Sequence, residues 1–235
     1  LATNLAVVFT ISLILSVLGI RPGGGIVPLA IFCFIWGMGG AFISLAISRW
    51  MAKTTMGVQL VDGNTGNADA DWLYRTVERL ARQANLPMPE VGIYDSPEVN
   101  AFATGPSKNR SLVAVSTGIM RTMRRNELEA VLGHEISHIA NGDMVTMTLL
   151  QGVMNAFVMF VARIVASIAA GQSKSERGSD AIYFFVRLVV EIILGIAGSL
   201  VTAWFSRYRE FRADAGAAAL TGSENMVAAL RRLAE

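Results

Sequence analysis

The sequence predicts a mainly α-helical membrane protein, with four transmembrane helices and a small α+β domain between the second and the third. Three observations support this fold class. The chain of 235 residues is 53% hydrophobic and only 16% charged, and its mean hydropathy is +0.47. Its apolar residues gather in four long runs, and a charged segment of mixed composition separates the second run from the third. Because soluble domains carry about 25% charged residues, we expect a chain that is partly embedded in a bilayer.

The first two apolar runs predict an N-terminal transmembrane hairpin. They cover residues 1–20 and 26–48, and neither contains a charged side chain. Each run is long enough to cross the ~30 Å hydrocarbon core of a bilayer as a helix. A cleaved signal peptide is the competing interpretation of the first run. The second run follows closely and no convincing cleavage site separates the two, which favours the hairpin.

The last two apolar runs, 144–170 and 181–206, predict a second hairpin. They contain three charged residues, namely Arg163, Arg187 and Glu191. A buried soluble helical pair or a re-entrant hairpin is therefore the alternative. On antiparallel spans Glu191 would lie within reach of both arginines. We expect either a buried ion pair that holds the hairpin together or arginines that extend to the membrane interface.

The remaining segments have the composition of a small soluble unit. Residues 71–84 have apolar side chains at helical spacing, whereas residues 90–94 and 111–116 predict short strands. Near the C-terminus, Ser223 is a candidate cap for an amphipathic helix, with an inward face formed by Met226, Leu230 and Leu233. We therefore divide the chain into residues 1–48, 49–143, 144–206 and 207–235.

The soluble segment contains His134-Glu135-Ile136-Ser137-His138, and its two histidines are the only ones in the chain. Residues four apart lie on one face of an α-helix, so both imidazoles can contact one metal ion while Glu135 points at the same space. This is the arrangement of zinc proteases. The alternative is a helix that merely carries two surface histidines.

The helix that carries this motif is marked at both ends. Asn126, with Glu129 three residues later, is a candidate N-cap, and Asn141-Gly142 is a natural left-handed stop. An apolar stripe predicts that one side of the helix is buried and that the histidines and Glu135 face a cleft. The stripe consists of Leu128, Val131, Leu132 and Ile139.

A catalytic zinc site keeps three protein ligands and one open position for water, so a third ligand must come from elsewhere. No histidine remains, and the single cysteine, Cys33, lies in an apolar run. The best candidate is Glu210. It lies four residues before Asp214 on one helical face, so Glu210 can bind zinc while Asp214 accepts a hydrogen bond from a ligating imidazole. Without the histidine motif, a charge cluster at the end of a membrane helix would be the preferred interpretation.

Three motifs together resemble HtpX, a family of bacterial membrane-bound zinc metalloproteases related to the CAAX prenyl proteases. The motifs are residues 134–143, Asn100-Ala101-Phe102-Ala103-Thr104-Gly105, and Arg209-Glu210-Phe211-Arg212-Ala213-Asp214. The resemblance implies a zincin-type, gluzincin-like protease domain with one zinc ion per chain, bound by His134, His138 and Glu210. It also implies that Glu135 is the general base and that Asp214 supports a ligand. Because family members usually continue further, we expect the chain to be truncated at its C-terminus.

The resemblance implies a metalloendopeptidase that cleaves membrane or misfolded proteins in envelope quality control and the stress response. In this mechanism a zinc-activated water attacks the peptide bond and Glu135 takes the proton. The alternatives are a processing protease for a specific lipidated or signal-bearing peptide and a non-catalytic membrane scaffold.

Zinc proteases generally bind substrate as an added strand. By resemblance, the turn at residues 100–105, with Asn100, Ala101 and Phe102, and the strand at residues 111–116 are candidates for this contact. An ordinary hairpin is the alternative.

The ligand candidates also constrain the topology. His134 and His138 precede the third apolar run and Glu210 follows the fourth, so two intervening spans place all three on one side of the membrane. Residues 171–180 then form a short turn on the other side. The distribution of Lys and Arg near the membrane ends predicts that the catalytic domain faces the cytoplasm. The resemblance implies a multi-pass protein of the bacterial inner membrane. The expected partners are protein substrates and the bilayer, because a net charge of +2 is too small to imply nucleic acid.

Overall fold

The protein is described by a computed structural model that covers residues 25–172 and 175–233. The first expected span, residues 1–20, lies outside the described residues. The chain divides into two compact units. The first, which we call the membrane unit, combines the chain up to Ile43 with Met147–Phe205. The second, which we call the soluble unit, combines Ser44–Thr146 with the chain from Ser206 onward.

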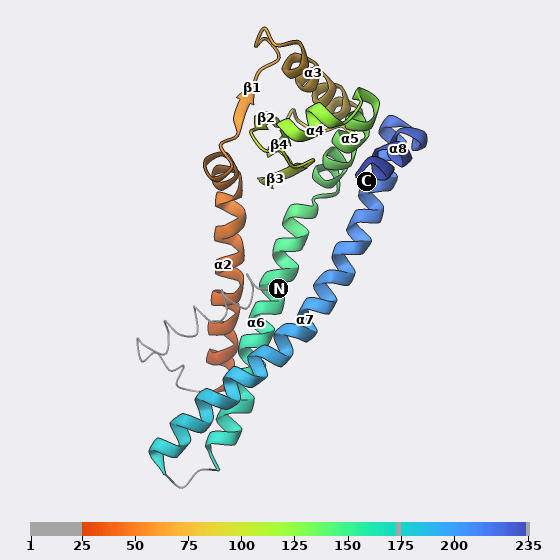
Figure 1. Ribbon diagram of the computed structural model, residues 1–235. Helices are drawn as coiled ribbons and strands as arrows, with labels where there is room; N and C mark the ends of the chain where they lie inside the picture. Colours follow the sequence, from red (N-terminus) through yellow and green to blue (C-terminus); the bar gives the residue numbers. More distant parts are fainter. Residues whose placement is uncertain (1–24, 173–174, 234–235) are drawn as a thin grey trace. The chain divides into compact units, whose positions relative to one another are not determined.

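Among the described residues, three helices supply the membrane unit: α2 (Ile26–Thr55), α6 (Asp143–Ala170) and α7 (Glu176–Thr221). All three are long and apolar enough to cross a bilayer. No more than a third of the residues in each apolar window are buried inside the protein, as suits contact with lipid rather than burial in a soluble helical pair. Figure 1 shows the three helices side by side. The backbones of α2 and α6 are in close contact, since a Cβ on Gly37 would lie 2.5 Å from the nitrogen of Ala156.

Helix α7 is unbroken over 46 residues. The fourth apolar run and the segment that carries Glu210 are therefore one element. No proline interrupts this stretch, and the arginine, glutamate and alanine residues after Ser206 favour helix. Because α7 begins at Glu176, the connection after α6 is shorter than the expected turn at residues 171–180.

The three charged residues of the apolar runs 144–170 and 181–206 are buried, with exposed fractions of 3% for Arg163, 8% for Arg187 and 4% for Glu191. Nε of Arg187 lies 3.8 Å from Oε1 of Glu191 on the same helix. Arg163 donates a hydrogen bond to the carbonyl of Met159 at 3.1 Å and lies over the ring of Phe32. The structure therefore supports buried arginines instead of arginines that extend to the interface.

The soluble unit contains a four-stranded sheet of order β1-β2-β4-β3. Its strands are β1 (Gln59–Val61), β2 (Glu90–Tyr94), β3 (Ala101–Ser107) and β4 (Arg110–Ser116). Strands β2 and β4 are parallel and the other pairs are antiparallel. The strands expected at residues 90–94 and 111–116 are thus present.

The expected turn at residues 100–105 was wrong, because this segment forms most of edge strand β3. The strand contains a register shift between Thr104 and Ser107. Gly105 has a φ of 143°, and a Cβ there would lie 2.2 Å from the carbonyl oxygen of Arg110. Only glycine fits this position.

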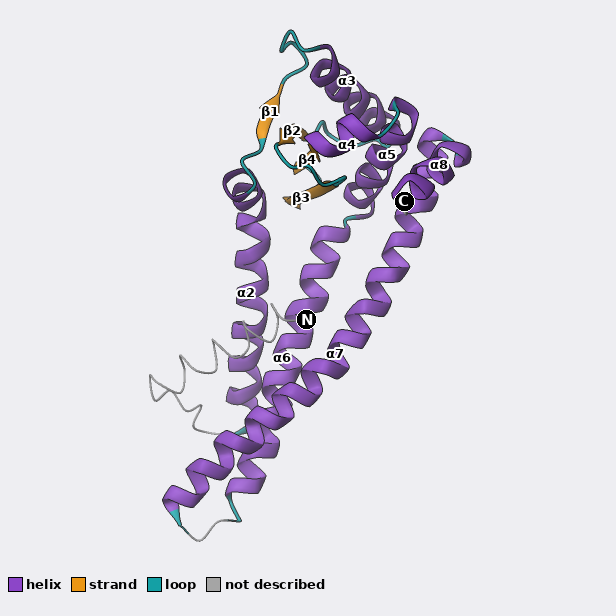
Figure 2. Ribbon diagram, viewed as in Figure 1, coloured by secondary structure: helices purple, strands orange, loops and turns teal. Residues whose placement is uncertain are grey.

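Four helices complete the soluble unit: α3 (Ala68–Gln83), α4 (Thr117–Thr122), α5 (Arg125–Asn141) and α8 (Ser223–Leu233). Helices α3 and α5 pack on the sheet around a common core (Figure 2). The largest fully buried side chains of this core include Leu73, Leu80, Ile119, Leu132, Ile136 and Ile139. The core positions the exposed side of α5, where the histidines lie.

Two helix ends differ from expectation. Helix α5 is capped by Arg124 and not by Asn126, because Glu127 accepts a hydrogen bond from the Arg124 backbone N–H at 2.9 Å. Helix α3 begins three residues earlier than expected, where the side chain of Asn67 caps it. The predicted end of α5 is confirmed, since Gly142 has a left-handed φ of 71°.

The predicted inward face of α8 is only partly confirmed. Met226 is buried, but Leu230 is 44% and Leu233 is 47% exposed. Besides Met226, the buried residue of α8 is Ala229. Amphipathic spacing identifies an apolar face, but it does not reveal how much of that face a neighbouring helix covers.

Candidate metal centre

Helix α5 presents two imidazoles from a rigid support. All four residues of its predicted apolar stripe are buried, while His134, Glu135 and His138 are only partly buried. The ring centroids of His134 and His138 lie 4.6 Å apart, and their Nε2 atoms are 3.0 Å apart. The i, i+4 spacing on the helix thus brings one nitrogen of each ring to a common point.

Helix α7 brings Glu210 to the same point. Its Oε2 lies 3.2 Å from Nε2 of His134 and 3.4 Å from Nε2 of His138. The three residues offer ligand atoms that all lie within 4.8 Å of one another. A tetrahedral ion with bonds of about 2.1 Å holds its ligand atoms about 3.4 Å apart. The spacing of these three atoms therefore fits a small metal ion.

A carboxylate contacts Nδ1 of each imidazole, the ring nitrogen that does not face Glu210. Nδ1 of His134 lies 2.8 Å from Oδ1 of Asp214, and Nδ1 of His138 lies 2.7 Å from Oδ2 of Asp143. A carboxylate accepts a hydrogen bond, so the proton of each neutral ring resides on Nδ1. The lone pair of each Nε2 is then free to face a metal ion.

Asp143 is the site residue for which sequence reasoning offered no role. It is 3% exposed and is the first residue of α6. A spacing of five does not place two residues on the same face of one helix, but the left-handed turn at Gly142 redirects the chain between His138 and Asp143. A sequence signal existed, namely an acidic residue immediately after a helix stop, but only the geometry of the turn reveals the contact.

Burial raises the pKa of Glu135 to about 8, even though the backbone N–H of Ala103 on β3 donates a hydrogen bond that favours the charged form. A carboxyl group with a pKa near neutrality can both accept and release a proton. A bound cation would add positive charge and lower this pKa.

The electrostatics of Glu210 favour its charged form. Burial acts to raise the pKa of Glu210, but the hydrogen bond from Arg209 and the nearby His138 outweigh burial and lower it. Nη2 of Arg209 lies 2.7 Å from Oε1 of Glu210. The other oxygen, Oε2, is the one that faces the imidazoles, so Glu210 has the charge and the orientation of a metal ligand.

The candidate substrate-binding residues lie on β3 or at its start. Ala101 and Phe102 pair with Val115 and Ala114 of β4, and the ring of Phe102 packs on Tyr94 with centroids 5.7 Å apart. The backbone N–H of Asn100 donates to the hydroxyl of Ser116.

The expectation that residues 111–116 could receive an added strand was wrong, because β4 is paired with β2 on one side and β3 on the other. In the described sheet, β3 has β4 on one side only and is the edge strand nearer to the histidine helix. An added strand therefore fits β3 and not β4.

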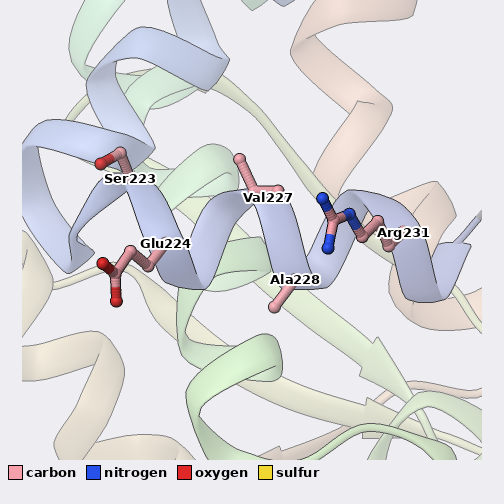
Figure 3. Close-up of a pocket in the computed structure, with 5 residues that line it drawn as sticks. All are labelled: Ser223, Glu224, Val227, Ala228 and Arg231. Atoms are coloured by element: carbon pink, nitrogen blue, oxygen red, sulfur yellow. The ribbon is translucent and has the colours of Figure 1, made fainter.

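A shallow hollow on α8 offers no comparable chemistry. It is lined by Ser223, Glu224, Val227, Ala228 and Arg231, all from one helix (Figure 3). None of these residues belongs to the metal centre, and a single carboxylate beside a single guanidinium does not form a converging set of ligands.

Comparison with known proteins gives consistent matches. The sequence model for peptidase family M48 matches residues 67–234. Protease HtpX of Idiomarina loihiensis is 52% identical over 237 residues, and the match covers 99% of this chain and 82% of that protein. A protease HtpX homolog of Thiobacillus denitrificans is 52% identical over 239 residues, with the same shares covered. Among solved structures, the crystal structure of S. mikatae Ste24p matches with a TM-score of 0.69 at 18% identity. That match covers 95% of this chain and 54% of Ste24p, so it shows the fold alone.

Proposed function

Because the chain belongs to peptidase family M48 and is therefore a membrane metalloprotease, we propose that His134, His138 and Glu210 bind one zinc ion per chain. The observation that carries this proposal is the convergence of two imidazole Nε2 atoms and one carboxylate oxygen, with a second carboxylate behind each imidazole. A set of two nitrogens and one oxygen suits zinc, whereas magnesium and calcium prefer oxygen ligands.

In the proposed reaction, Glu135 is the general base. When bound, zinc supplies the Lewis acidity that lowers the pKa of a water molecule and polarises the scissile carbonyl. Glu135 accepts a proton from the attacking water and later delivers it to the leaving amine nitrogen. Its place between the histidines in the sequence and its elevated pKa support this role. Asp214 and Asp143 hold the imidazoles in the orientation that the ligands need.

We place the substrate along the free edge of β3. The edge backbone of the strand that carries Ala101 and Phe102 can pair with an extended peptide without reading particular side chains. The backbone N–H and carbonyl of Asn100 are already paired with Ser116, so Asn100 marks the start of this edge. The hydrogen bond from Ala103 to Glu135 supports this placement, because it connects the same strand to the general base.

The proposed biological role is cleavage of membrane or misfolded proteins in envelope quality control, by a multi-pass protein of the bacterial inner membrane whose catalytic unit faces the cytoplasm. Three observations support it: three helices suited to span a bilayer, the bias of Lys and Arg toward the segments that carry the metal ligands, and the similarity to proteases named HtpX. Helices α6 and α7 supply the two spans that separate His138 from Glu210 in the sequence.

Zinc content and proteolysis of the detergent-solubilised chain test the proposal. We expect one zinc per chain and cleavage of an unfolded protein such as casein. If the purified protein contains no zinc and binds none when zinc is added, the proposed metal site is wrong. Zinc without cleavage would favour the non-catalytic scaffold, and cleavage of one defined peptide bond in a lipidated peptide would favour the processing protease.

A further inference from the structure

Helices α5 and α7 are in close contact beside the metal centre, at two glycines. A Cβ built on Gly216 of α7 would lie 2.4 Å from Oγ and 2.8 Å from Cβ of Ser137 on α5. A Cβ built on Gly133 of α5 would lie 2.9 Å from Cγ2 of Thr221 on α7. Real Cβ atoms essentially never approach other atoms within 3.0 Å. Neither position accepts a methyl group unless the two helices move apart.

The facing residues have little freedom to yield. Ser137 is 4% exposed, and its hydroxyl donates a hydrogen bond to the carbonyl of Gly133 at 2.8 Å. The hydroxyl of Thr221 likewise donates to the carbonyl of Ala217 at 2.8 Å. Rotation of either side chain away from the contact breaks its hydrogen bond. An added methyl group is therefore accommodated by a shift of the helix backbones.

The contact is adjacent to the metal centre on both helices. Gly133 and Ser137 immediately precede His134 and His138, respectively, and Gly216 follows Asp214 by two residues. The helices run antiparallel here, since His134 contacts Asp214 while Asn141, further along α5, accepts a hydrogen bond from the earlier residue Arg212. Along α7, Gly216 lies about 9 Å from Glu210.

The separation of the helices therefore controls the geometry at the metal. Metal ligands must lie within about 0.2 Å of their ideal distances. To relieve a contact of 2.4 Å, α7 must withdraw by about 1 Å to reach ordinary van der Waals distance. A movement of that size takes Glu210 away from the imidazoles and lengthens the 2.8 Å hydrogen bond between Asp214 and His134.

We propose that Gly216 and Gly133 are positioning residues that set the distance between α5 and α7 and thereby the affinity of the site for zinc. This inference rests on the proposed metal site. It assigns to two glycines, which carry no functional group, control over where Glu210 and Asp214 meet the histidines.

The test is a rescue experiment on the full chain in detergent. For Gly216→Ala we expect the Kd for zinc, measured by competition with a chromophoric chelator, to rise by about tenfold or more, in the range seen when a partner of a metal ligand is lost. The visible spectrum of the Co²⁺-loaded variant should change as well. Adding Ser137→Ala should restore affinity in part, and adding Ser137→Gly should restore it further, because these changes remove first the Oγ and then the Cβ contact.

A second, independent pair repeats the test at Gly133. Gly133→Ala should weaken zinc binding less than Gly216→Ala, and Thr221→Ser should rescue it, because serine keeps the hydroxyl and lacks Cγ2. Gly40→Ala on α2 is the matched control, since a Cβ there meets nothing within 4 Å. Alanine favours helix over glycine, so a weaker site cannot be ascribed to helix propensity.

Parental zinc affinity in folded Gly216→Ala, or a loss that Ser137→Gly does not relieve, would overturn the inference while leaving the proposed function intact. If Gly216→Ala does not fold by circular dichroism, the Gly133 and Thr221 pair decides by the same criteria. If the parental chain binds no zinc, the proposed metal site fails and the inference fails with it.

Discussion

At the scale of single residues, each histidine uses its two ring nitrogens for different purposes. Nδ1 of each ring contacts an aspartate, while Nε2 faces the other ring and Glu210. The two aspartates differ in burial, because the side chain of Asp143 is 4% exposed and that of Asp214 is 32% exposed. Water competes less for the buried pair, so the two histidines are not equally supported.

Replacement of either aspartate should weaken the metal site. We expect Asp214→Asn and Asp143→Asn to lower zinc affinity by about 10 to 100-fold, with the larger loss for Asp143→Asn because its carboxylate is more buried. Chelator competition measures both. Asp69→Asn, at an exposed residue that pairs with Arg125, is the control and should bind zinc like the parent. Unchanged affinity in Asp143→Asn would show that its contact with His138 does not support the metal.

Replacement of the proposed general base should separate chemistry from metal binding. Glu135→Gln should keep zinc and the fold but lower proteolysis by at least about 100-fold, because general-base catalysis contributes a factor of that order. Glu129→Gln on the same helix is the matched control, since Glu129 pairs with Arg79 outside the metal centre. Casein cleavage at the parental rate by Glu135→Gln would exclude Glu135 as the base.

At the scale of elements, edge strand β3 depends on one glycine. The register shift after Thr104 lets the strand continue to Ser107, and Gly105 occupies a backbone conformation that other residues avoid. The same strand donates the Ala103 hydrogen bond to Glu135. The shape of β3 is therefore connected to the site through its backbone and not through its side chains.

Gly105→Ala should disrupt β3. We expect a loss of unfolding free energy of about 1–3 kcal/mol from backbone strain alone, and proteolysis should fall more than zinc affinity because β3 supplies no metal ligand. Thermal unfolding and chelator competition measure the two effects. Gly66→Ala is the control: its φ of 75° is also positive, but a Cβ there meets nothing within 4 Å. Equal effects of the two changes would argue against a specific role of the register shift.

At the scale of the whole molecule, the soluble unit is assembled from two stretches of chain that the apolar segment Met147–Phe205 separates. His138 lies before α6, and Glu210 lies on the part of α7 that belongs to the soluble unit. The metal ligands can meet only if the chain returns to the side of the membrane that it left, which requires an even number of crossings.

This topology predicts the exposure of the connection between α6 and α7. In a Cys33→Ser background, Ser175→Cys should react with a membrane-impermeant thiol reagent added to intact spheroplasts, whereas Asn109→Cys, in the exposed turn after β3, should react only after permeabilisation. Both positions are exposed. Labelling of Ser175→Cys only after permeabilisation would mean that α6 and α7 do not span the bilayer.

The sequence by itself determined what depends on spacing along one element. Two histidines four apart share a helical face, Glu210 and Asp214 do the same, and apolar runs of sufficient length indicate spans, because helix geometry alone relates these residues. The buried stripe of α5, its stop at Gly142 and two of the strands follow from the same local rules.

Only the tertiary structure decided what depends on contacts between elements. The partnership of Asp143 with His138 follows from the direction of the chain after Gly142, and the strand at Ala101–Ser107 follows from pairing with β4. The burial of Arg163 and the contact of Gly216 with Ser137 likewise need a neighbouring helix at a definite distance. Such distances result from packing across the whole unit, and no local pattern of residues encodes them.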